Sequence, residues 1–166
     1  MRACEARCML RFEVCLLLFV TACSGSSETS GPRSAPSPTS SLQHSPALIE
    51  TADGSVLFNV ELAVNDRERD LGLMNRDSLG SSDGLALLFF RPTRAGLWMK
   101  NTTIPLSAAF FDDEGKILKI IDMDPCVTAP CRIYRPGVRY FGALEVNQGA
   151  FDRHGIRVGD TIHLAP

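Results

Sequence analysis

Five residues of types suited to ligand recognition lie inside otherwise apolar segments of the chain. Trp98, Lys100 and Asn101 fall within four consecutive positions, Arg76 follows a Gly-Leu-Met-Asn run, and Glu145 is flanked by leucine and valine. On a strand, Trp98 and Lys100 would share a face because side chains alternate. An indole beside a cation and an amide is typical of sites that hold a sugar or a small polar ligand. In such a site Trp98 would stack, Lys100 and Arg76 would pair with anionic groups, and Asn101 would orient the ligand.

The same residues also have ordinary structural interpretations. An indole can fill a core, a turn asparagine can hydrogen-bond backbone, and a charged residue in a strand usually faces water. Glu145 alternates with Ala143 and Asn147, which favours the solvent-facing side of its strand. If Glu145 were buried, a cation such as Arg76 or Lys100 would be needed to offset the loss of hydration.

The sequence contains no recognisable catalytic constellation. His154 and His163 are isolated, so neither a Ser-His-Asp triad nor a histidine metal site is indicated. We therefore expect no metal, no cofactor and no catalytic residue. One enzymatic alternative stays open, an envelope hydrolase in which Glu145 acts as general acid or base.

Cys126 and Cys131 are separated by four residues. Redox-active pairs are separated by two, and no nearby Cys or His completes a zinc site. Exported proteins meet an oxidising environment, in which such cysteines pair. The sequence predicts a structural disulfide that stabilises the fold by roughly 2 kcal/mol through closure of a short loop.

An export signal is predicted over residues 1–22. Its nine-residue apolar run, Val14 to Ala22, is shorter than the roughly 20 residues that a membrane-spanning helix needs. The run ends in Val20-Thr21-Ala22-Cys23, which resembles the box of bacterial lipoproteins that are cut before a lipidated cysteine. We predict that Cys23 carries the lipid and anchors the protein to the outer membrane or an outward-facing membrane surface of a bacterial envelope.

A tether is predicted to follow the lipidated cysteine. Ser, Pro, Gly and Thr make up 17 of the 23 residues from 24 to 46. This composition cannot bury enough apolar surface to offset the entropy of ordering. We expect a disordered tether over residues 23–46 and a single folded domain over residues 47–166.

The charge balance excludes one large class of partner. The chain has 19 acidic and 17 basic residues, a formal net charge of −2. Nucleic-acid binding depends on an excess of basic side chains, so we expect no nucleic-acid partner. The expected partners are the membrane, through the lipid anchor, and an envelope glycan or protein.

Alternation of apolar and polar residues dominates the domain. It predicts a strand with one buried face over residues 56–62, whereas the continuous apolar run 85–90 predicts a strand buried on both faces. Asn65 and Glu68 form a capping-box pattern that predicts a short helix, and residues 148–154 predict one helical turn. Further strands are predicted over residues 96–99, 104–111, 116–122, 139–146 and 161–164.

These elements indicate a mostly β fold, with α+β as a variant. We expect a compact antiparallel β-barrel or sandwich of about seven or eight short strands with one or two short helices.

Several short motifs are distributed along the domain in a distinctive order. They are Gly72-Leu73-Met74-Asn75-Arg76, residues 84–90, Trp98-Met99-Lys100-Asn101-Thr102 with Ile104-Pro105-Leu106, Leu144-Glu145-Val146-Asn147 with Gly149, and Gly155-Ile156 with Gly159-Asp160. Their order resembles the domain-of-unknown-function 192 (DUF192) family of bacterial and archaeal domains. The resemblance implies a compact, largely β domain and no established activity. The sequence departs from the family pattern at Ser107, where an aspartate usually follows Pro-Leu.

The sequence thus predicts a lipid-anchored envelope protein whose domain binds a small ligand, a carbohydrate or a protein. The candidate binding residues are Arg76, Trp98, Lys100, Asn101 and Glu145. The alternatives are the hydrolase that uses Glu145 and a purely structural module.

Overall fold

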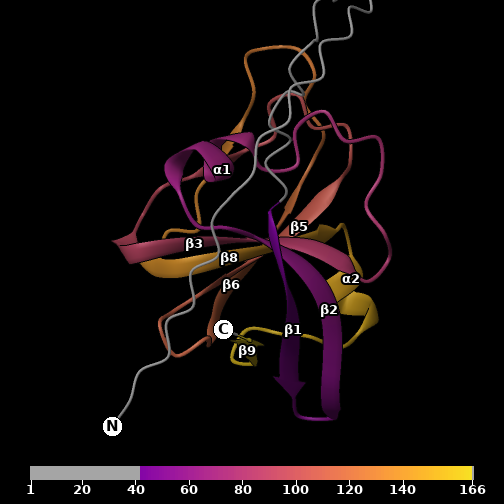
Figure 1. Cartoon of the computed structure of the whole chain (residues 1–166), viewed down its shortest axis with the longest axis vertical. Helices are drawn as coiled ribbons and strands as arrows, with labels where there is room; N and C mark the ends of the chain where they lie inside the picture. The colour runs from indigo at the N-terminus through magenta and orange to yellow at the C-terminus, as the bar shows by residue number, and fades with distance from the viewer. Residues whose placement is uncertain (1–41, 166) are drawn as a thin grey trace, which may run out of the picture. The chain divides into compact units, whose positions relative to one another are not determined.

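The computed structural model describes residues 42–165 and contains nine strands and two short helices (Figure 1). The signal peptide, Cys23 and most of the predicted tether lie outside the described residues. The elements, in chain order, are β1 (Gln43–Thr51), β2 (Gly54–Ala63), α1 (Asp66–Leu71), β3 (Asp83–Thr93), β4 (Leu97–Trp98), β5 (Leu106–Phe111), β6 (Ile117–Met123), β7 (Ile133–Tyr134), β8 (Tyr140–Asn147), α2 (Ala150–Arg153) and β9 (Thr161–Leu164).

Seven strands form one sheet in the order β6-β5-β8-β3-β2-β1-β9, and β4 pairs with β7 in a separate two-stranded ribbon. The prediction of a mostly β fold is confirmed. The strands of the large sheet pair antiparallel except β2 and β3, which are parallel. The chain between these two strands passes through α1 and returns to the same end of the sheet, as a parallel pair requires. Within the described residues, the two edges of the sheet meet only at an isolated bridge between Lys116, which precedes β6, and Thr161 of β9. Because β6 and β9 form no continuous ladder, the sheet is sandwich-like and does not close into a barrel.

Apolar layers cover both faces of the central strands β3, β5 and β8. One layer contains Leu144 and Val146 of β8 together with Phe151 of α2. The other contains Ala143 of β8 and Leu85 of β3, and the β4–β7 ribbon covers it. The two helices accordingly lie on opposite sides of the β3–β8 pair (Figure 1). A side chain on either face of the middle of β8 is therefore removed from bulk water.

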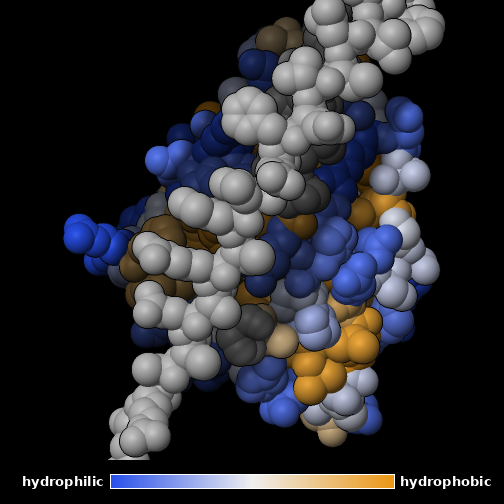
Figure 2. All heavy atoms as spheres, in the orientation of Figure 1, coloured by the Kyte–Doolittle hydropathy of each residue, from blue (hydrophilic) through white to orange (hydrophobic). Residues whose placement is uncertain are grey.

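The first strand begins earlier than the sequence suggested. Residues 43–46, placed at the end of the predicted tether, belong to β1 and pair with β2. The Ser45 hydroxyl donates a hydrogen bond to the carbonyl of Ala165 at 2.9 Å, which fixes this strand next to the chain's last residues. Farther along, Leu48 and Leu57 pair on the outer face of the hairpin and are exposed. Figure 2 shows apolar surface over this hairpin among mostly hydrophilic atoms.

The predicted capping box begins α1. The Asn65 side chain accepts a hydrogen bond from the Glu68 amide at 3.0 Å, and the Glu68 carboxylate accepts from the amides of Val64 and Asn65. Gly72 ends the helix with a φ of 50°, a conformation that other residues rarely adopt. The helix is thus fixed at both ends although it is only six residues long.

A disulfide joins Cys126 and Cys131, whose Cα atoms are 5.8 Å apart, so the predicted pairing is present. The amide of Cys126 donates to the carbonyl of Thr102 at 3.1 Å. This bond connects the disulfide loop to the segment that follows β4. Neither helix among residues 42–165 has the length and apolar character to cross a membrane.

Candidate functional site

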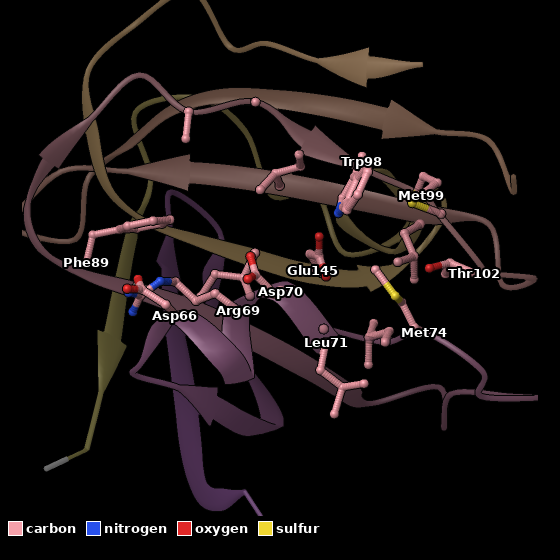
Figure 3. A pocket seen from close by; sticks show the side chains of 17 residues that line it. Asp66, Arg69, Asp70, Leu71, Met74, Phe89, Trp98, Met99, Thr102 and Glu145 are labelled. Atoms are coloured by element: carbon pink, nitrogen blue, oxygen red, sulfur yellow. The ribbon is translucent and has the colours of Figure 1, made fainter. Parts of the chain in front are cut away.

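A cavity of about 190 Å³ lies between α1, the β4 segment and the second face of the sheet (Figure 3). Its walls combine apolar side chains with a few charged and polar ones, as in many ligand sites. The lining includes Asp66, Arg69, Asp70, Met74, Phe89, Trp98, Met99, Thr102 and Glu145.

Glu145 lies at the base of this cavity. It occupies the middle of β8, paired with Leu85 of β3 and Ala108 of β5, and only 6% of its surface is exposed. Among the described residues its carboxylate has neither a hydrogen bond nor an ion pair. Burial raises the pKa of Glu145 to about 7, because the charged form loses hydration.

The prediction that Glu145 faces solvent is wrong. The alternation along β8 was read correctly, since Leu144 and Val146 lie on the opposite face. However, the β4–β7 ribbon and α1 cover the face that Glu145 shares with Ala143. Neither Arg76 nor Lys100 forms an ion pair with it, so the expected counter-charge is also missing.

Trp98 lies at the rim of the cavity, on β4, with 48% of its surface exposed. In Figure 3 its indole lies above the Glu145 carboxylate. The Lys100 ammonium is 5.2 Å from the centre of the indole ring, within the range of a cation–π interaction. Trp98 is therefore a surface group available for stacking and not a core side chain.

The α1 helix supplies the charged side of the cavity. Arg69 donates to the carbonyl of Leu88 and to the Asp66 carboxylate, both at 2.6 Å, and its guanidinium lies 4.8 Å from the centre of the Phe89 ring. Asp70 is exposed at the cavity mouth. The single arginine of this helix face is thus engaged by groups other than Glu145.

The structure does not bring Arg76 and Asn101 into the cavity. Arg76 forms two hydrogen bonds to the Glu61 carboxylate, at 2.5 and 2.6 Å, beside a separate hollow. This hydrogen bonding lowers the pKa of Glu61 and raises that of Arg76. Asn101 is exposed with a φ of 53°, and its carbonyl accepts a hydrogen bond from the Asn75 amide at 2.8 Å. Of the five predicted residues, Trp98 and Glu145 line the cavity and Lys100 contacts Trp98 from outside it.

The DUF192 family model, described as an uncharacterized ACR, matches residues 48–164. The chain belongs to the DUF192 family. No curated protein matches it. Two solved structures are similar, each with a TM-score of 0.69.

One of these structures is a protein from Sinorhizobium meliloti 1021, provisionally described as a transcription regulator. It is 29% identical, and the alignment covers 75% of this chain and 95% of that one. The other is a protein of unknown function from Novosphingobium aromaticivorans DSM 12444. It is 31% identical, with 84% of this chain and 99% of that chain covered. These comparisons establish the family and the fold of this DUF192 domain.

Sequence reasoning missed several residues of the cavity in this DUF192 domain. Asp66, Arg69 and Asp70 follow the spacing of one helix face, a signal that could have been read once Asn65 marked the helix start. Met74 and Thr102 belong to the motifs that carry the family resemblance, but nothing local indicates that they meet. Among residues 42–165, no group of three His, Cys, Asp or Glu side chains could hold a metal ion.

Replacing Glu145 with Gln should remove a pH-dependent destabilisation. The pKa of Glu145 is raised from 4.5 to about 7 in the folded chain. Folding therefore favours the protonated form, and the free energy of unfolding falls as pH rises from 4.5 through 7. Ionisation above pH 7 costs about 3 kcal/mol at most. We expect E145Q to be more stable than wild type at pH 8, and the difference to shrink toward pH 5.

Urea denaturation at pH 5, 6.5 and 8 measures this difference. The exposed turn residue Glu114 provides the matched control, since E114Q should track wild type at every pH. An E145Q effect that stays constant across the three pH values would show that Glu145 is not desolvated in solution.

Proposed function

We propose that this DUF192 protein is an exported, lipid-anchored envelope protein whose domain binds a small ligand in the cavity above Glu145. The observation that carries the binding proposal is the combination of a buried carboxylate at the base with a half-exposed indole at the rim. Buried polar groups are normally hydrogen-bonded, and those that are not are concentrated at functional sites. A ligand that reaches the base would supply the missing partner.

The size of the cavity limits what can enter it. Its volume of about 190 Å³ is below the roughly 300–1,000 Å³ of typical drug-sized pockets. A single sugar ring, a small amine, or one side chain of a larger partner fits this size. The exposed indole would cover the flat or apolar face of the ligand, and the Thr102 hydroxyl is a polar group on the wall.

The charges favour some ligands over others. The lining contains three carboxylates, those of Asp66, Asp70 and Glu145, against one guanidinium, that of Arg69. Arg76, which was expected to pair with anionic groups, is neutralised by Glu61 outside the cavity. Neutral and cationic ligands are therefore favoured over anionic ones.

Trp98 is the only tryptophan of the chain, so its fluorescence reports on the cavity. We expect small sugars or amines to change its emission in a saturable way, because the bound molecule would contact the indole. The control is the double variant W98F/L57W, because Leu57 is exposed on β2 and does not line the cavity. If iodide quenches Trp98 but neither sugars nor amines change its emission, the binding proposal is wrong.

A hydrolase is the second candidate, and the pKa of Glu145 favours it. A carboxyl group with a pKa of about 7 suits general acid–base catalysis at neutral pH, and Asp70 places a second carboxylate on the same cavity. Cleavage of an envelope glycan that is reduced at least 100-fold by both E145Q and D70N would assign this activity. Turnover that is unchanged in E145Q would dismiss it.

The lipid anchor is supported by the Val-Thr-Ala-Cys sequence that ends at Cys23. In a bacterial host supplied with labelled palmitate, we expect the full-length chain to incorporate the label and C23A to lose it. C15A is the matched control, because Cys15 precedes the cleavage point and should not affect labelling. Label that persists in C23A would place the modification elsewhere.

A further inference from the structure

The Glu145 carboxylate is the one strongly desolvated acid in the described part of the chain that lacks a partner. It is 6% exposed and points into the cavity (Figure 3). Glu61, which is partly buried, is matched by Arg76 through two hydrogen bonds. An unpaired buried charge is strongly unfavourable, whereas a cation brought to it in a site of low dielectric is held firmly.

The cations already near the cavity do not fill this role. Arg69 is held by Asp66, by the Leu88 carbonyl and by the ring of Phe89. Lys100 lies against the Trp98 ring and is not part of the cavity lining. The position next to the carboxylate is therefore open to a cation from outside.

The walls of the cavity suit an organic cation better than a hydrated metal ion. Trp98 presents an indole, and Met74 and Met99 present polarisable thioethers. Such surfaces favour ammonium or guanidinium groups that carry apolar substituents. A hard metal ion would need several oxygen ligands, and the described residues provide no such cluster.

We propose that the cavity binds a small organic cation, a substituted ammonium or guanidinium group, with its charge against the Glu145 carboxylate and its apolar part against Trp98. This inference rests on the proposed function, because it names the class of ligand that enters the same cavity. It extends to a lysine- or arginine-like group at the end of a larger molecule, provided that one cationic group enters.

Binding of such a cation depends on pH through Glu145. The free carboxyl has a pKa of about 7, so a cation must displace its proton below that pH. From α1, Asp66, Arg69 and Asp70 face the cavity. The two aspartates are exposed at its mouth, where their negative charge adds to the attraction of a cation.

Two further ionisable groups lie close to this site. Lys100, which follows β4, carries a positive charge beside the Trp98 ring that opposes the approach of a cation. Tyr140 of β8 is buried and donates its hydroxyl to the Ala95 carbonyl. Burial and the charge of Glu145 raise its pKa to about 12, so it stays neutral. The lining residues from β3 and β5 are apolar, which leaves Glu145 as the group that titrates near pH 7.

The test compares choline with 3,3-dimethylbutan-1-ol, its neutral analogue of the same shape, and with N-acetylglucosamine. Each is titrated into the purified full-length chain at pH 8.5 and 5.5, with Trp98 emission and calorimetry as readouts. Choline has no titrating group in this range. We expect it to bind at least tenfold more tightly than the neutral analogue at pH 8.5. Its affinity should fall by about 30-fold at pH 5.5, the loss expected from protonating a group of pKa about 7.

Two variants test whether the Glu145 carboxylate causes the preference for choline and its pH dependence. E145Q should lose at least tenfold in choline affinity at pH 8.5 and should lose the pH dependence, whereas E114Q should behave as wild type. Equal binding of choline and its neutral analogue would overturn the cation inference while leaving small-ligand binding intact. Binding of the sugar alone would have the same meaning. If none of the three probes changes Trp98 emission or produces heat, both proposals fail.

Discussion

The structure depends on the burial of both faces of three neighbouring strands, β3, β5 and β8. One face carries the apolar layer closed by α2, and the other carries the layer closed by the β4–β7 ribbon. Once both faces are covered, every position in the middle of β8 is removed from bulk water. Position 145 is then a place where an apolar side chain would stabilise the fold, and a glutamate there is a cost that folding alone does not explain.

Glu61 shows that the chain can neutralise the cost of a partly buried carboxylate. Glu61 is hydrogen-bonded by Arg76, and its pKa is lowered. Glu145 is more deeply buried, and this burial alone raises its pKa. Unlike Glu61, it has no cation among the described residues to offset the lost hydration. A carboxylate that is left without a cation at the base of an accessible cavity is best understood as a binding group.

Local patterns predicted most of the fold. The capping box at Asn65, the hairpin of β5 and β6, the final strand and the Cys126–Cys131 disulfide all follow from short sequence signals. The first four residues of β1 were missed, because their composition is that of a tether and their order comes from pairing with β2 and contact with Ala165. Short-range signals cannot reveal an element that is stabilised by distant partners.

In the candidate site, too, local sequence signals predicted some features, whereas others depend on distant parts of the chain. Periodicity placed Glu145 on the face opposite Leu144 and Val146, but which face is covered depends on the β4–β7 ribbon. The pairing of Arg76 with Glu61 joins a loop to β2 and leaves no local trace in the sequence. A motif can therefore identify the residue types of a site, whereas tertiary packing decides which of them meet.

The segment that forms the cavity rim is fixed by contacts with other parts of the chain. Strand β4 has two residues, too few to be stable alone, and it is fixed by pairing with β7. The Cys126 amide binds the Thr102 carbonyl, and the Asn75 amide binds the Asn101 carbonyl. The disulfide loop and the segment after α1 thus set the position of Trp98 relative to Glu145. The cysteine pair contributes to the geometry of the cavity as well as to stability, because it closes the loop that carries one of these two supports.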